Sequence, residues 1–207
     1  MDLSSEFNKD DKISEFMLKN EFAKQLLEAQ LSVLIKEFEY KNHYNPIEHV
    51  KSRIKSDESI RDKLKRKGYE YSLENLKSHV HDIVGIRIVC SFLSDVYEIV
   101  DLIKNSGQFE IVAEKDYIET PKETGYISYH LIVNVPVYLN KDTEYIEAEI
   151  QVRTIAMDFW ASIDHKIHYK FLETPKDVQN DLYACSLAIK ALDNRMNQLN
   201  EIVHKYD

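Results

Sequence analysis

The chain has 207 residues, of which 43% are hydrophobic and 30% charged, a composition that suits a packed domain and excludes a disordered chain. Its formal net charge of −9 argues against a DNA-binding or general RNA-binding protein, because such proteins are usually basic. No apolar run of about 18 residues is present, and the N-terminus is too polar for a secretory signal, so we expect a cytoplasmic protein without a membrane span. Cys90 and Cys185 lie far apart in apolar surroundings and are expected to be buried thiols.

The first part of the chain is predicted to be helical. Apolar residues recur at helical spacing over residues 13–42. A second helix is predicted over residues 46–67, because Pro46 suits its first turn and Gly68 suits its end. A short helix over residues 72–79 is expected to follow.

Strands dominate the middle of the chain, and helices return at its end. The strands are expected over residues 83–92, 109–118, 128–137 and 145–153, and the helices over 94–105, 155–171 and 176–205. This order predicts an α+β fold, with a sheet flanked by helices. No internal repeat or linker is visible, so we expect one domain.

The last predicted helix carries an apolar seam with gaps of three and four residues. Such a seam can pack either on its own domain or on a second copy of the chain, and the pattern does not distinguish these outcomes. Its members are Leu182, Cys185, Ile189, Leu192, Met196, Leu199 and Val203.

The segment YIEAEIQVRT, residues 145–154, alternates with a period of two. One parity is apolar and predicts a face buried in the core. The other parity is polar and is either an ordinary solvated face or a functional one. The apolar set is Ile146, Ala148, Ile150 and Val152, and the polar set is Glu147, Glu149, Gln151 and Arg153.

Residues 51–67 hold eight basic and three acidic residues and are therefore strongly basic within an acidic chain. This segment is either a solvated helix face or an anion site. On the predicted helix, Lys55, Ser59, Lys63 and Arg66 would lie along one face, which suits an extended polyanion such as a triphosphate. That function requires acidic metal ligands opposite this face.

Asp82 precedes the apolar strand of HDIVGIR, and Arg87 lies within it. Asp82 is either a turn residue or a functional carboxylate. A regular strand would place Asp82 and Arg87 on opposite faces, and a bulge at Gly85 could remove that conflict.

The segment KETGYISYH, residues 122–130, begins with a turn at Gly125. Tyr126 and His130 share one parity, so they could stack on a base or bind a ribose, unless the strand is simply half-buried. Asp158 follows on the next helix. Neither a cysteine cluster, an HExxH motif, a P-loop nor a Rossmann glycine motif is present, so we do not expect zinc or a standard phosphate loop.

Several of these segments together resemble a known family. The motifs RIKSDESIRDKLKRKG, HDIVGIRIVCSF, KDYIETPKETGYISYH and EAEIQVRTIAMDFWASIDHKIHYK come in the order and spacing of the synthetase domain of RelA/SpoT proteins. No hydrolase domain with a His-Asp metal motif precedes them, so the chain resembles a small alarmone synthetase, with NPIEHVKSR closest to the RelP-like branch.

This resemblance implies a fold and an activity. The fold would be nucleotidyltransferase-like, a mixed sheet flanked by helices, in one domain of 1–207. Within it, we expect an N-terminal helical extension (1–45), a catalytic core (46–171) and a C-terminal helix for oligomerisation (172–207). The enzyme would transfer the β,γ-pyrophosphate of ATP to the 3′-hydroxyl of GDP or GTP, giving ppGpp or pppGpp. The family habit and the apolar seam suggest a homotetramer.

The resemblance also implies roles for individual residues. Asp82 would hold Mg²⁺, and Glu149 would share the metal or act as the catalytic base. ATP would be bound by Arg53, Lys55, Lys63 and Arg87, together with Ser59 from the predicted helix face. The acceptor nucleotide would be bound by Lys122, Tyr126, His130, Gln151 and Asp158, with Tyr126 stacked on the guanine.

One departure and two alternatives remain. The family usually has Arg or Gln where this chain has Ile127, so an anion contact from that position is lost. A related toxic synthetase that pyrophosphorylates tRNA or adenosine nucleotides is one alternative, although no second basic surface outside residues 51–67 supports it. A non-catalytic nucleotide-binding or RNA-binding regulator is the other, and the retention of both Asp82 and Glu149 argues against it.

Overall fold

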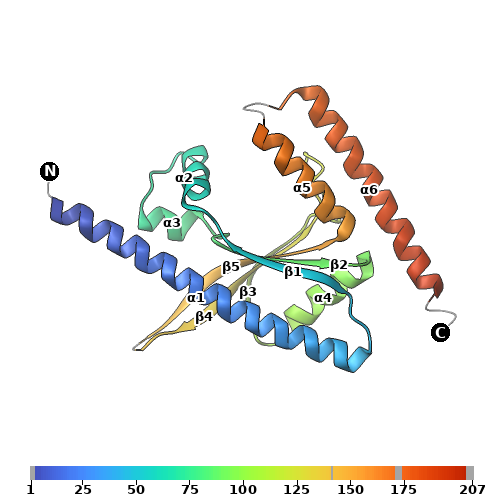
Figure 1. Cartoon of the computed structure of the whole chain (residues 1–207), viewed down its shortest axis with the longest axis horizontal. Helices are drawn as coiled ribbons and strands as arrows, with labels where there is room; N and C mark the ends of the chain where they lie inside the picture. The colour runs from blue at the N-terminus through green and yellow to red at the C-terminus, as the bar shows by residue number, and fades with distance from the viewer. Residues whose placement is uncertain (1–2, 141, 171–173, 204–207) are drawn as a thin grey trace.

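The computed structural model describes residues 3–140, 142–170 and 174–203, and it forms a mixed α+β fold around one five-stranded sheet (Figure 1). The helices are α1 (Leu3–Asn42), α2 (Asp57–Arg66), α3 (Leu73–His79), α4 (Leu93–Asn105), α5 (Ile155–Lys170) and α6 (Lys176–Val203). The strands are β1 (Ile47–Ile54), β2 (Val84–Cys90), β3 (Glu110–Asp116), β4 (Tyr129–Tyr138) and β5 (Thr143–Thr154). The predicted α+β class is confirmed.

The strand order is β1-β2-β5-β4-β3, so β5 lies at the centre of the sheet. Strands β2 and β5 are parallel, and the other neighbouring pairs are antiparallel. The long helix α1 crosses one face of the sheet, with α4 on the same side (Figure 1). Helices α2 and α3 lie toward one end of the sheet, and α5 and α6 lie toward the other (Figure 1).

The alternation of β5 decides which face of the sheet is apolar. Ile146, Ala148, Ile150 and Val152 are buried, as predicted, and pack in the cluster that α1 and α4 complete. From α1, Leu27, Leu31 and Leu34 enter the same cluster at helical spacing. The polar parity of β5 therefore points to the opposite face of the sheet.

The predicted helix over residues 46–67 is wrong. Its first half is β1, an edge strand paired with β2 through a ladder that is irregular between Ile47 and His49. Only Asp57–Arg66 is helical, and Ser56 caps it by accepting a hydrogen bond from the backbone N–H of Ser59. The polar residues of β1 carry no strong strand signal, and tertiary pairing with the apolar β2 determines its conformation.

Two further expectations need correction. Cys90 is buried, as predicted, but Cys185 is exposed on α6. The bulge proposed at Gly85 is also absent, because β2 pairs in continuous register with β5 over Val84–Cys90 and with β1 over Val84–Val89.

The apolar seam of α6 packs on the domain only in part. Leu182 is buried, but Leu192, Met196 and Leu199 are each 45 to 50% exposed. The predicted ends of this helix and of the preceding one fall partly on residues 171–173 and 204–207, which lie outside the described residues. Across the described ranges, no helix combines the length and apolar character that a bilayer span requires.

Candidate active site

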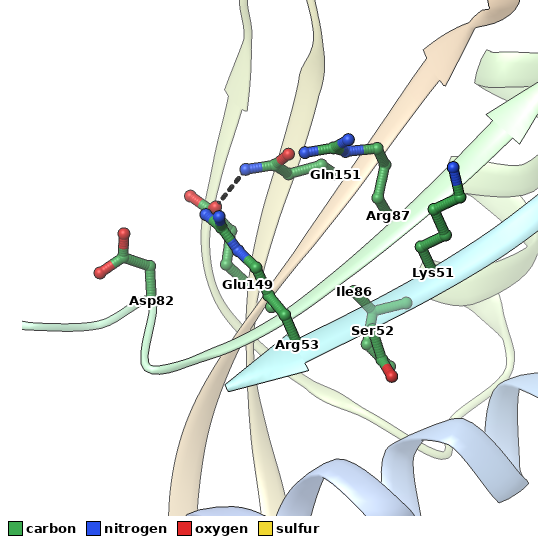
Figure 2. A pocket seen from close by; sticks show the side chains of 9 residues that line it. Lys51, Ser52, Arg53, Asp82, Ile86, Arg87, Glu149 and Gln151 are labelled. Atoms are coloured by element: carbon green, nitrogen blue, oxygen red, sulfur yellow. Dashed lines mark hydrogen bonds between the residues drawn. The ribbon is translucent and has the colours of Figure 1, made fainter. Parts of the chain in front are cut away.

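A cavity of about 300 Å³ opens on the polar face of the sheet, opposite α1 and α4 (Figure 2). Its walls come from β1, β2, β5 and the turn before β2. Among the side chains that line it are Lys51, Arg53, Asp82, Arg87, Glu149 and Gln151. Segments separated by about a hundred residues in the chain therefore meet at one polar site. All of these residues except Lys51 belong to the predicted active site.

Strand register arranges these side chains in two rows across the sheet. Arg53 is paired with Gly85, and Gly85 with Glu149, which gives one row. The next row runs from Lys51 through Arg87 and Gln151 to His130 of β4. Neighbouring side chains in such rows lie about 5 Å apart at their Cβ atoms and can interact directly.

Gly85 lies under the side chain of Arg53. A Cβ placed there would lie 3.6 Å from both Cγ and Nε of Arg53, which is ordinary van der Waals contact. The side chain of Arg53 therefore passes over this position toward the carboxylate of Glu149, as Figure 2 shows. The strand is regular at Gly85, and the glycine does not introduce a bulge.

Asp82 reaches the same cavity because it lies in a turn and not in the strand. Lys55 Nζ donates to one carboxylate oxygen at 2.8 Å, and Lys63 Nζ donates to the other at 2.7 Å. Burial alone would raise the pKa of Asp82, but the two lysines outweigh it and lower the pKa to about 2. Asp82 is therefore an ionised carboxylate held between two cations.

The predicted row of basic residues on one helical face is only partly correct. Lys55 follows β1 and precedes α2, so it does not share a helical face with Lys63, yet both ammonium groups meet at Asp82. Ser59 lies in the exposed first turn of α2, where its hydroxyl accepts a hydrogen bond from Ser56. Arg66 lies in the exposed last turn.

Glu149 is held by two neighbours on the polar face. His130 Nδ1 lies 3.0 Å from Oε1, and Gln151 Nε2 donates to Oε2 at 2.5 Å. Burial raises the pKa of Glu149, but the hydrogen bonds from His130 and Gln151 lower it, and the net pKa is below the ordinary value. The negative charge of Asp82 raises the pKa of Glu149, because the two carboxylates lie close enough to interact electrostatically.

His130 lies between the carboxylate of Glu149 and the hydroxyl of Tyr126. An ionised carboxylate only accepts, so Nδ1 donates to Glu149. Nε2 lies 2.8 Å from Tyr126 Oη. Burial raises the pKa of Tyr126 and the positive charge of Arg153 lowers it, leaving the pKa above its ordinary value, so the hydroxyl stays protonated. His130 therefore links Tyr126 to the carboxylate of Glu149.

An aromatic group completes this end of the site. The loop between β3 and β4, residues 117–128, brings the ring of Tyr117 to 6.0 Å from Tyr126 and 5.2 Å from His130, edge to face in both cases. Lys122 Nζ lies 4.6 Å from the Tyr117 ring centroid and 4.8 Å from that of Tyr126. Tyr117 was missed from the sequence, because its place directly after β3 gave no periodic signal.

Arg153 is the most connected residue that the sequence-based site omitted. It is 3% exposed, and its guanidinium donates to Ser128 Oγ at 3.1 Å, to Gln151 Oε1 at 2.8 Å and to the hydroxyl of Tyr126. Its parity with Glu149 was a usable signal, because both belong to the polar set of β5. A buried arginine with several oriented partners points to a structural role in the site.

Asp158, at the start of α5, joins two cations. Its Oδ1 lies 3.1 Å from Arg87 and 3.3 Å from Arg153. Burial and the charge of Arg153 lower the pKa of Arg87, whereas Asp158 raises it, so the carboxylate offsets the repulsion between the two guanidiniums. Within the described part of the chain, the buried Nε of Arg87 has no hydrogen-bond partner.

The predicted site residues thus fall into four groups. Arg53, Asp82, Arg87, Glu149 and Gln151 line the cavity, and Lys55 and Lys63 bind Asp82 beside it. Lys122, Tyr126, His130 and Asp158 form the adjoining network, whereas Ser59 lies on an exposed helix turn, where its hydroxyl contacts Ser56.

Other nearby side chains do not join the site. Ile127 is buried in the core, as its parity predicted, and Glu147 pairs with His81. No set of three or more His, Cys, Asp or Glu side chains capable of holding a metal occurs among the described residues. A metal that also uses phosphate oxygens needs fewer protein ligands, so this finding does not count against Mg²⁺.

The fold and this charged cavity together are those of a RelA/SpoT synthetase. The family described as "Region found in RelA / SpoT proteins" matches residues 52–174, and the chain belongs to this family. Among curated relatives, the chain is 48% identical to GTP pyrophosphokinase YwaC of Bacillus subtilis over 181 residues, covering 87% of this chain and 86% of YwaC. It is 35% identical to GTP pyrophosphokinase YjbM of the same organism, covering 92% and 90%.

Solved structures of small alarmone synthetases match over nearly the whole chain. Small alarmone synthetase 2 of Bacillus subtilis superposes with a TM-score of 0.81 and 45% identity, covering 91% of this chain and 97% of that chain. Small alarmone synthetase 1 bound to its product pppGpp gives a TM-score of 0.86 and 33% identity, covering 94% and 99%. The resemblance inferred from the motifs is confirmed.

Proposed function

We propose that this chain is a GTP/GDP pyrophosphokinase that makes the alarmones pppGpp and ppGpp. The observation that carries the proposal is the meeting of Asp82 and Glu149 at one cavity with five basic residues around it. A chain 48% identical to a GTP pyrophosphokinase supports the same activity, and a relative with bound pppGpp supports the product class.

The reaction moves one pyrophosphoryl group. The 3′-oxygen of GDP or GTP attacks the β-phosphorus of ATP, the bond from that phosphorus to the oxygen bridging it to the α-phosphate breaks, and AMP leaves. Such a transfer needs charge neutralisation and in-line positioning more than a covalent intermediate. Arg53, Lys55, Lys63 and Arg87 bind the ATP phosphates, with Ser59 at the edge of this basic group.

Glu149 is the residue we assign to the proton of the 3′-hydroxyl. Its lowered pKa keeps it ionised at neutral pH, so it can accept that proton. His130 and Gln151 hold both of its oxygens, which fixes the direction from which the hydroxyl approaches. The strand places this carboxylate beside Arg53, so the acceptor oxygen and the donor phosphates meet at one point.

Asp82 and Glu149 also fit a magnesium ion. Mg²⁺ prefers oxygen ligands and is commonly bound by one or two carboxylates together with substrate phosphates. When bound, it neutralises phosphate charge during the transfer. Lys55 and Lys63 balance the charge of Asp82, which keeps that carboxylate ionised beside the cavity.

The acceptor nucleotide is assigned to the aromatic end of the site. Tyr126 offers a ring to the guanine, while its hydroxyl is held by His130 and Arg153. Lys122 lies over the same ring and binds the acceptor phosphates. Both guanidinium contacts of Asp158 use Oδ1, so we assign Oδ2 to the N1–H and N2–H₂ groups of guanine. Gln151 links this end to Glu149.

We also propose a single-domain, cytoplasmic enzyme that assembles as a homotetramer. The support is the exposed apolar surface of α5 and α6, which a second copy would cover. Large exposed apolar side chains on these helices include Ile155, Phe159, Leu187, Leu192, Met196 and Leu199.

The deciding experiment is incubation with ATP labelled at the γ-phosphate, Mg²⁺ and each of GMP, GDP and GTP in turn. We expect labelled ppGpp from GDP, labelled pppGpp from GTP, and AMP equal in amount to product. Label transferred only to tRNA or to an adenosine nucleotide would instead support the toxic synthetase alternative. No transfer to any acceptor would contradict the proposal.

A further inference from the structure

We propose that α6 positions the loop that carries the acceptor-binding residues, and that Lys190 and Ser186 are the positioning residues. We call residues 117–128 the acceptor loop. This inference rests on the proposed function, because it concerns how the same site holds GDP or GTP.

The first contact joins α6 to the start of the acceptor loop. Lys190 Nζ donates to the backbone carbonyl of Ile118 at 3.0 Å, across 72 positions of sequence. Ile118 itself is buried, so its carbonyl cannot shift without disturbing the core. Tyr117 precedes it and makes the edge contact with His130, so the lysine acts one residue from the aromatic group.

The second contact joins α6 to the end of the acceptor loop. Gly125 has φ +88°, and a Cβ on it would lie 3.0 Å from Cβ of Ser186 and closer still to Oγ. Ser186 is buried, and its hydroxyl donates to the carbonyl of Tyr183 at 2.8 Å. The loop backbone therefore rests directly on α6 at the residue before Tyr126.

The inner face of α6 is anchored at further points by polar contacts. Trp160 Nε1 donates to the carbonyl of Leu182 at 2.8 Å, and Thr154 Oγ1 donates to Asp193 at 2.7 Å. Asn197 Oδ1 accepts from the backbone N–H of Ser94 at 2.8 Å. The helix is therefore fixed to α4, α5 and the end of β5, and it can support the loop as a rigid element.

The contacts of α6 reach one side of the site only. Among the described residues, none of its hydrogen bonds or ion pairs goes to Lys55, Lys63 or Asp82, which are bound to one another at the far end of the cavity. Loss of an α6 contact should therefore weaken GDP and GTP binding while ATP binding stays unchanged. A general loss of stability would lower the fraction of active enzyme without weakening acceptor binding more than ATP binding.

Steady-state kinetics of Lys190→Met tests the inference, with both substrates varied in turn. We expect the acceptor KM to rise about tenfold, the scale of losing one hydrogen bond from a charged donor, while the ATP KM stays within twofold. Lys190→Arg keeps a donor and should restore most of the acceptor affinity. Lys176→Met, an exposed lysine at the start of the same helix, is the matched control.

A second variant makes the result independent of Lys190. Ser186→Val adds bulk where Gly125 rests, so it should also raise the acceptor KM selectively. Equal changes in both KM values, or an unchanged acceptor KM in both variants, would overturn the positioning role. A wild-type enzyme without transfer activity would instead overturn the proposed function, so the two failures are distinguishable.

Discussion

The two ends of the proposed site, one at Asp82 and the other at Tyr126, are held together by different contacts. At the end proposed to bind ATP, Lys55 and Lys63 bind Asp82 through direct ion pairs. At the end proposed to bind the acceptor nucleotide, Arg153 is almost fully buried and is linked to Tyr126 and Gln151 by hydrogen bonds. The comparison shows one site with a cluster of ion pairs on one side and a buried hydrogen-bond network on the other.

Glu149, which stands where the two ends meet, gives the largest expected effect. Glu149→Gln removes the proton acceptor but leaves the apolar parity of β5 unchanged, so kcat should fall about 10³-fold with the melting temperature little affected. Turnover assays and thermal unfolding would measure both quantities. Glu147→Gln, on the same strand face and paired with His81, is the matched control and should remain active. Near-normal turnover in Glu149→Gln would remove its assigned role.

Variants of Tyr126 and Lys63 test directly whether the two ends of the site bind different substrates. Tyr126→Ala removes the ring expected to stack on guanine, so the acceptor KM should rise about 10- to 100-fold with the ATP KM little changed. Lys63→Met should do the reverse and raise the ATP KM about tenfold. Two-substrate kinetics would measure both. If each variant changed both KM values equally, the two ends would not be separate.

Asp193 on α6 gives the smallest expected effect. Burial raises the pKa of this carboxyl above its ordinary value, although the hydrogen bond from Thr154 lowers it in part. A raised pKa in the folded state means that stability from this group is greatest below the unfolded pKa of 3.8 and is lost as pH rises through the folded pKa. Asp193→Asn keeps an acceptor for Thr154 without a charge.

Urea unfolding of Asp193→Asn at several pH values would measure this effect. At pH 7 we expect the variant to be more stable than the wild type by about 1 kcal/mol or less, with the difference shrinking as pH falls toward 4. A variant less stable at pH 7 would show that the charge itself supports the start of α5.

Much of the sheet and of the site could be predicted from local pattern. Alternation assigned both faces of β5, and Asp82 was found because an acidic residue precedes an apolar strand. The strand β1 was missed because an edge strand with polar residues depends on its partner, which periodicity within the segment cannot show. The same error placed Lys55 on a helix.

The features of the site that the sequence did not predict depend on contacts between distant segments. Arg153 shared the parity of Glu149, but only the folded chain reveals Ser128 and Tyr126 as its partners. The inner face of α6 was equally hidden, because Ser186 and Lys190 make specific polar contacts that an apolar heptad pattern ignores. A seam of leucines identifies a helix surface but not which side of the helix the domain uses.

The register of β5 constrains how this protein can evolve. Successive residues of the strand alternate between the core and the proposed active site, so one inserted or deleted residue would exchange the two roles along the remaining strand. Glu149 would then point into the hydrophobic core, and Ile150 would face the proposed active site. We therefore expect descendants of this chain to keep the length of β5 constant and to vary in the connecting segments instead.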